Sequence, residues 1–131
     1  MKSTMRIVAL GVALAASSAA FGQSATKPPR YDVKAEVNMI GKVVSLTTIP
    51  DWMGRDGVNI ALQLPEATAS HVDVATAAFL KTFEFPIAVG DELKLTGCWS
   101  ESAGSPVFLV HEMTNQRVTL LVRDPSGQPL W

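Results

Sequence analysis

The sequence predicts an all-β domain with one short helix, folded as a small five-stranded barrel with an extra C-terminal strand. Three observations support this prediction. Apolar and polar residues alternate with a period of two along most of the chain after residue 35, which is the pattern of half-buried strands. One segment rich in Ala and Leu, residues 75–83, has helical spacing instead. A glycine interrupts the first and longest predicted strand.

The first predicted strand, residues 35–48, changes its phase of alternation in the middle. Val37 and Met39 share one parity, whereas Val44 belongs to the opposite parity. Gly41 lies at the change of phase, where a bulge or a sharp bend is tolerated. We therefore expect this strand to bend at Gly41 and to pair in two halves of the barrel.

The second predicted strand, residues 58–64, alternates most clearly. Its aliphatic side chains face one side, and Asn59 and Gln63 face the other. A short third strand, residues 71–74, follows and leads into the helix.

In the predicted helix, Ala75, Phe79 and Phe83 are spaced by four residues and share one face. The fourth strand, residues 91–99, alternates so that Trp99 joins the core face and Cys98 lies opposite.

Two more apolar segments, residues 106–113 and 117–122, complete the predicted strands. This order, with a helix between strands three and four, is that of a five-stranded OB-like barrel followed by an extra strand. A generic β-sandwich is the competing architecture, but the single helix and the glycine within the first strand favour the barrel.

The chain ends in "RDPSGQPLW", residues 123–131. Pro125 suits the second position of a type I turn, after which Leu130 and Trp131 would fold back to cover the barrel. We expect Trp131 to pack as a plug, although a ligand-stacking role remains the alternative.

The N-terminus has the features of a secretory signal. Lys2 and Arg6 precede an uncharged apolar run, and small residues flank a cleavage position before Gln23. A retained membrane anchor is the alternative, but the run is shorter than the about 20 residues that a span needs. The predicted organisation is a signal peptide, an extended leader and an OB-like domain, residues 1–22, 23–30 and 31–131. We expect a periplasmic protein with no membrane span after cleavage.

Charge argues against nucleic acid as the partner. Removal of the signal leaves nine Lys and Arg residues against 12 Asp and Glu residues, a net charge of −3. Nucleic-acid affinity comes mainly from Lys and Arg that neutralise phosphates, and the chain has no basic cluster.

No catalytic or cofactor motif is found, so we expect a protein that is not an enzyme and has no cofactor. His71 and His111 lack metal-ligand spacing, although these two with Cys98 and Met113 could form a soft metal site. Cys98 has no charged neighbour that would activate it and is expected to be an inert thiol. The only tyrosine, Tyr31, is far from both histidines in sequence, which argues against a His–Tyr haem attachment.

The loop at residues 49–57 is the most distinctive candidate for binding, because it places Trp52 beside Arg55. OB-type barrels bind ligands across strands two and three and at the adjoining loops. The other such loop is residues 100–106, with Trp99 at its base. The predicted ligand-binding residues are Trp52, Arg55, Asn59, Gln63 and Trp99, with no catalytic or metal residue. An inward-folded Trp52 that caps the barrel is the equal alternative.

Four stretches resemble a group of small exported bacterial OB-fold-like proteins, mostly without an assigned function. They are "YD…EV…GKV" from Tyr31, "V-x-V…FLK" from Val72, "VGDELKLTG" from Val89 and the C-terminal R-D-x-x-G-x-P-x-W from Arg123. The resemblance implies an OB-like fold over nearly the whole mature chain. Our interpretation is an exported, non-catalytic binding or interaction module for an unknown small molecule or periplasmic protein. An OB-fold nucleic-acid-binding protein is the alternative, and a metal or redox protein is the third.

Overall fold

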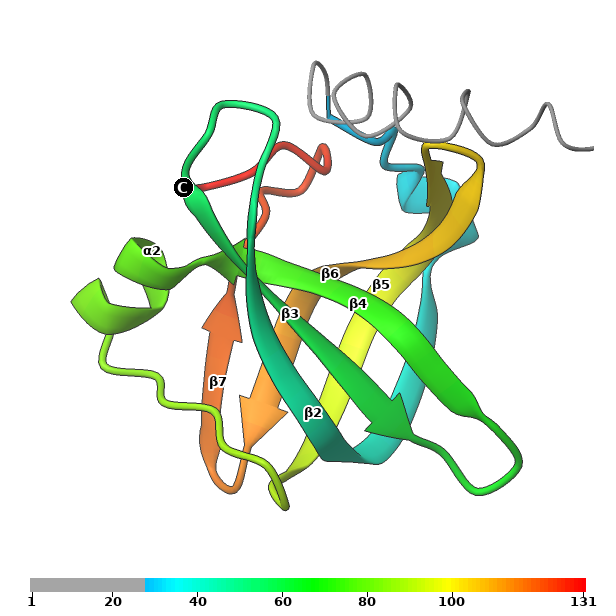
Figure 1. The fold of residues 1–131 in the computed structure, drawn as a ribbon, viewed down its shortest axis with the longest axis vertical. Helices are drawn as coiled ribbons and strands as arrows, with labels where there is room; N and C mark the ends of the chain where they lie inside the picture. The colour runs from blue at the N-terminus through cyan, green and yellow to red at the C-terminus, as the bar shows by residue number, and fades with distance from the viewer. Residues whose placement is uncertain (1–27) are drawn as a thin grey trace, which may run out of the picture.

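The computed structural model describes residues 28–131. Residues 1–27, which contain the predicted signal peptide and most of the leader, lie outside the described part (Figure 1). The described elements are one 3-10 helix, six strands and one α-helix. In chain order they are η1 (Val33–Ala35), β2 (Val37–Pro50), β3 (Asp56–Gln63), β4 (Thr68–Thr76), α2 (Ala77–Thr82), β5 (Glu92–Ser102), β6 (Ser105–Asn115) and β7 (Val118–Leu121).

The strands form one sheet that closes on itself. Their order is β4-β3-β2-β5-β6-β7, and an additional pairing joins β4 to β6. That closing pair is short and parallel, with Val72 opposite Phe108 and Asp73 opposite Leu109. Five strands therefore form a barrel-like ring, and β7 extends the sheet beyond β6. This arrangement, with one short helix between β4 and β5, confirms the predicted fold class.

Strand β2 is shared by both halves of the ring, as its change of phase predicts. Residues 37–42 pair with β5, and residues 42–50 pair with β3. Gly41 lies where β2 and β3 approach closely, because a Cβ there would come within 2.5 Å of the Gln63 carbonyl oxygen. The register shift itself occurs between Val43 and Ser45. The bulge therefore lies after the predicted position, and Gly41 is required by the close approach of β3.

At the C-terminal end of β5, the prediction of which side chains face the core was wrong. A register shift between Thr96 and Gly97 reverses the alternation, so Cys98 is fully buried and Trp99 is 46% exposed. Gly97 permits the shift, since a Cβ there would meet the Leu109 carbonyl oxygen at 2.1 Å. The sequence pattern continues without a break across this position, which is why periodicity did not reveal it.

Helix α2 begins two residues later than predicted. β4 is longer than the predicted strand 71–74 and continues through Ala75, which is buried in the core. Thr76 is the N-cap, and its hydroxyl accepts a hydrogen bond from the Phe79 amide at 3.2 Å. Ala75 therefore does not share a helical face with Phe79, and Phe83 is exposed.

The C-terminal segment turns as predicted and returns to the barrel. The Gly127 amide donates to the Asp124 carbonyl at 2.9 Å, which is the hydrogen bond of a β-turn. Trp131 is partly buried against the core, with its ring 6.3 Å from that of Phe79. Leu130 is 48% exposed. Packing of Trp131 is therefore confirmed, whereas the expected cover by Leu130 is wrong.

The segment before β2 is attached to β6 by side chains. Tyr31 donates a hydrogen bond to Glu36, and Glu36 also contacts His111 Nδ1 at 2.6 Å. The Tyr31 and His111 rings meet edge to face at 5.9 Å. The inference from sequence distance that Tyr31 lies far from both histidines is therefore wrong for His111.

Within residues 28–131, no helix has the length and apolar character needed to cross a membrane.

Candidate functional site

A hollow of about 170 Å³ lies where the outer face of β3 and β4 meets the β2–β3 loop and the end of β5. These are the segments at which the sequence places a ligand in an OB-like barrel. The lining residues are Pro29, Ile49, Pro50, Asp51, Trp52, Gly57, Asn59, His71, Asp73, Ser102 and Val107.

The loop that carries Trp52 is held by its own carboxylate. Asp51 accepts hydrogen bonds from the Met53 and Arg55 amides at 2.9 and 2.8 Å. It also forms an ion pair with Arg55 at 2.9 Å. Partial burial raises the pKa of Asp51, but the hydrogen bonds and charge of Arg55 outweigh it and keep the pKa below its ordinary value. These contacts hold the loop in a turn that presents Trp52 with 40% of its surface exposed.

The floor of the hollow is polar. Asn59 on β3 and Asp73 on β4 are register partners, and both side chains line the hollow. Asn59 is only 8% exposed, and its Oδ1 atom is buried with no hydrogen-bond partner among the described residues. Such a group costs free energy unless something satisfies it.

Asp73 adds a carboxylate to this floor. Burial raises its pKa, and the positive charges of Arg123 and His71 only partly offset this effect. Across residues 28–131, two ion pairs are present, Arg55–Asp51 and His111–Glu36, and Asp73 takes part in neither. Among the described residues, therefore, Asn59 Oδ1 has no hydrogen-bond partner and Asp73 has no ion-pair partner.

The structure brings together some of the predicted site residues and separates others. Trp52 and Asn59 line the hollow, and Arg55 lies next to it through its ion pair with Asp51. Gln63 lies four residues beyond Asn59, about 13 Å along the strand, where its amide bonds the Leu64 carbonyl at 3.1 Å.

Trp99 lies in a different depression. It lines a hollow with residues 30–34 of the N-terminal segment, and its ring packs edge to face on Phe108 at 5.2 Å. The reversal of β5 at Gly97 is the reason that Trp99 points outward there.

Sequence reasoning missed Asp73 and considered His71 only as a candidate ligand for a soft metal. The signal was present in "HVDV", because alternation places His71 and Asp73 on the face opposite the buried Val72 and Val74. The segment was interpreted as a strand, and its outward side chains were not considered together as contacts for an organic ligand.

Side chains that could bind a metal do not lie together in the part of the chain that the structure describes. No cluster of three His, Cys, Asp or Glu side chains is found in residues 28–131. Cys98 is fully buried, its Sγ accepts a hydrogen bond from the Asp32 amide at 3.4 Å, and burial raises its thiol pKa. A thiol in this state is a poor nucleophile and a poor metal ligand.

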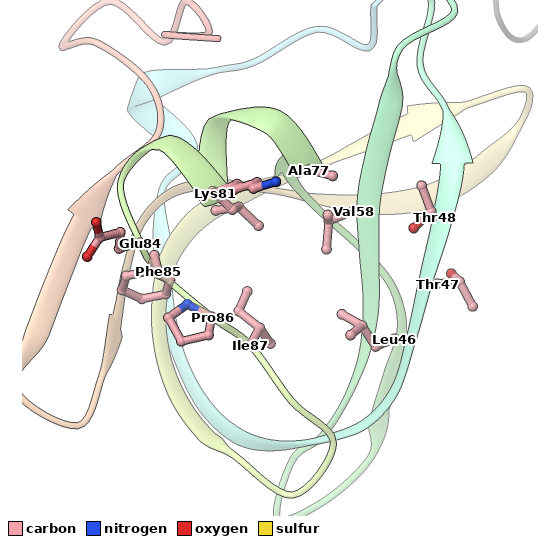
Figure 2. A pocket seen from close by; sticks show the side chains of 11 residues that line it. Leu46, Thr47, Thr48, Val58, Ala77, Lys81, Glu84, Phe85, Pro86 and Ile87 are labelled. Carbon is pink, nitrogen blue, oxygen red and sulfur yellow. The ribbon is translucent and has the colours of Figure 1, made fainter.

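A larger hollow of about 550 Å³ lies at the end of the barrel beside α2 (Figure 2). Its lining is mostly apolar and comes from β2, β3, α2 and the segment that leads to β5. The lining residues are Leu46, Thr47, Thr48, Val58, Ala77, Leu80, Lys81, Glu84, Phe85, Pro86 and Ile87. Helix α2 has only six residues and contacts β3 and β4. The part of the opening next to β2 stays uncovered.

Comparison with known proteins identifies the family. Residues 36–120 match the MamS/MamX magnetosome protein family. The match covers the whole five-stranded ring and most of β7, and it ends before the C-terminal turn. No curated protein matches the chain. Because this match covers well over half of the sequence, the chain belongs to the MamS/MamX magnetosome protein family.

Proposed function

We propose that this chain is an exported, magnetosome-associated binding module without catalytic activity, and that its ligand occupies the hollow between Trp52 and the β3–β4 face. The observation that carries the proposal is the pair of polar side chains, Asn59 and Asp73, on the floor of this hollow. Protein interiors normally satisfy a buried polar atom such as Asn59 Oδ1, and Asp73 lies beside it as its register partner. A ligand that donates hydrogen bonds would satisfy them here.

The chemistry of the hollow favours a small polar molecule. Its volume of about 170 Å³ admits a compact ligand. Asp73 would accept hydrogen bonds from that ligand, and the indole of Trp52 would cover its apolar or cationic part. The Asp73 carboxylate would repel phosphate groups, and Arg55 is already paired with Asp51, which argues against the alternative of a nucleic-acid-binding protein.

The export part of the proposal depends on the signal-like N-terminus, and the association with magnetosomes depends on the family. The signal-like segment predicts that the mature protein starts at or near Gln23 and is recovered outside the cytoplasm.

Ligand retention tests the proposal. The chain is purified from a periplasmic fraction, its N-terminus is sequenced, and small molecules released on denaturation are identified by mass spectrometry. We expect one species to be retained by the parent and by Asp56→Asn, a control on the exposed start of β3. Asp73→Asn and Trp52→Ala should each lose it. Release of nothing from the parent, or equal retention by Asp73→Asn, would contradict the proposal.

A further inference from the structure

The hollow beside α2 differs from the proposed site in both shape and chemistry. Its volume of about 550 Å³ is within the roughly 300–1,000 Å³ range of ligand pockets. Leu80, Phe85 and Val58 are buried and line it with apolar surface. Leu46 forms one side of the hollow, and it is 42% exposed. An uncovered apolar hollow of this size is typical of a binding site for a ligand with an apolar body.

The charged groups at the rim are arranged asymmetrically. Figure 2 shows the Lys81 side chain across the top of the hollow, with its ammonium on the side of Ala77. The Glu84 carboxylate lies beyond Phe85 and away from Leu46 and Val58 (Figure 2). Among residues 28–131, Lys81 is in neither of the two ion pairs. The one charge placed over the apolar surface is therefore positive and available.

We propose that this hollow binds a free amphipathic carboxylate, an acyl chain whose tail lies against Leu80, Phe85 and Ile87 and whose carboxylate pairs with Lys81. The apolar lining selects the tail, and the lone ammonium selects the sign of the head group. This site is independent of the hollow at Trp52, so the two ligands can be tested separately.

Tail length supplies the first quantitative expectation. Each methylene that leaves water contributes roughly a fourfold gain in affinity. Decanoate has two more methylenes than octanoate and should bind about 15-fold more tightly. Equal affinities for the two acids would show that the tail is not buried.

Head-group charge supplies the second expectation. Isothermal titration calorimetry compares decanoate with decyltrimethylammonium, which has the same tail and the opposite charge, both below their micelle-forming concentrations. Decanoate should bind more tightly to the parent. Lys81→Gln should weaken decanoate about fivefold, the value of one exposed ion pair, and Lys94→Gln on the exposed face of β5 should not.

Leu46→Asn tests the location of the site. Because Leu46 is partly exposed, the substitution should preserve the fold while weakening every probe at least tenfold. Val118→Asn, at an exposed aliphatic residue on β7, is the matched control and should bind as the parent does. Trp52→Ala should also retain decanoate.

Several results would overturn the assignment. They are absence of decanoate binding to the parent, equal binding by Leu46→Asn and Val118→Asn, or preference for the cationic probe. Amide chemical-shift changes in the parent give a reading that needs no variant. Changes centred on Leu80 and Ile87 support the site, and changes centred elsewhere reject it.

Discussion

Arg123 is the residue on which the C-terminal segment depends. It is buried, and its Nε and Nη1 atoms donate to the carbonyls of Val110 and Gly127 at 3.1 and 2.9 Å. Its guanidinium lies between two aromatic rings, 5.0 Å from the centroid of Tyr31 and 5.2 Å from that of Trp131. A planar, weakly hydrated cation fits this position. One side chain therefore joins the N-terminal segment, β6 and the chain end.

Arg123→Lys should lower the free energy of unfolding by about 2–3 kcal/mol, although it preserves the charge. An ammonium cannot reach both carbonyls with a planar fork, so a buried acceptor loses its partner. Urea unfolding followed by tryptophan fluorescence measures the change. Arg117→Lys, on the exposed turn before β7, should stay within about 0.5 kcal/mol of the parent. A similar small effect of Arg123→Lys would show that charge alone is sufficient at this position.

Among the contacts between elements, Glu36 links the segment around η1 to β6 through Tyr31 and His111. Partial burial would raise the pKa of Glu36, but hydrogen bonds from Tyr31 and His111 outweigh it and hold the pKa below its ordinary value. A carboxyl group with a depressed folded-state pKa stabilises the fold above its unfolded pKa, near 4.5. This contribution is lost as the pH falls through the folded-state pKa.

Glu36→Gln should therefore change the acid limb of the stability curve. At pH 7 the variant should be less stable than the parent by about 1–2 kcal/mol, because a charged hydrogen-bond acceptor is removed. The difference should shrink as the pH falls from 5 to 3. Urea curves at these pH values provide the measurement, and Glu112→Gln on β6 is the control. Parallel curves for the parent and Glu36→Gln would contradict the assignment.

Across the whole molecule, the aromatic residues divide between packing and surface roles. Trp131 packs against the core, Phe79 and Arg123, whereas Trp52 projects from an ordered loop. The end of the chain closes the barrel surface near α2, and the loop residue remains available for contact. Trp131 and Trp52 are the same type of residue, but their surroundings differ, so the first packs and the second is exposed.

Trp131→Ala should cost about 2 kcal/mol, roughly half the value for a fully buried aromatic, because the indole is only partly buried. Trp52→Ala should cost less than about 1 kcal/mol while removing the ligand proposed for the hollow. Denaturant unfolding of both variants and the parent tests the comparison. If Trp52→Ala were the more damaging substitution, Trp52 would be a cap on the barrel and not a binding residue.

The sequence by itself determined the class of fold. Period-two alternation reports which side chains leave water, and it located the strands because each strand has one buried face. The change of phase at Gly41 revealed the shared strand β2, and the Pro125 turn was visible from residue type alone. Trp52 and Asn59 were predicted as ligand contacts because OB-type barrels bind ligands at this loop and strand, and both line the same hollow.

Tertiary structure decided what depends on register and on packing between distant segments. The reversal of β5 at Gly97, which turned Trp99 outward and Cys98 inward, arises from the bulge in pairing with β6 and leaves no trace in the alternation. Asp73 became a candidate only when β4 placed it opposite Asn59. The hollow beside α2 exists because a six-residue helix cannot cover the barrel end. The alternation of residues along a strand indicates which side chains are buried. Only the pairing of strands in the closed ring determines which outward side chains lie next to each other.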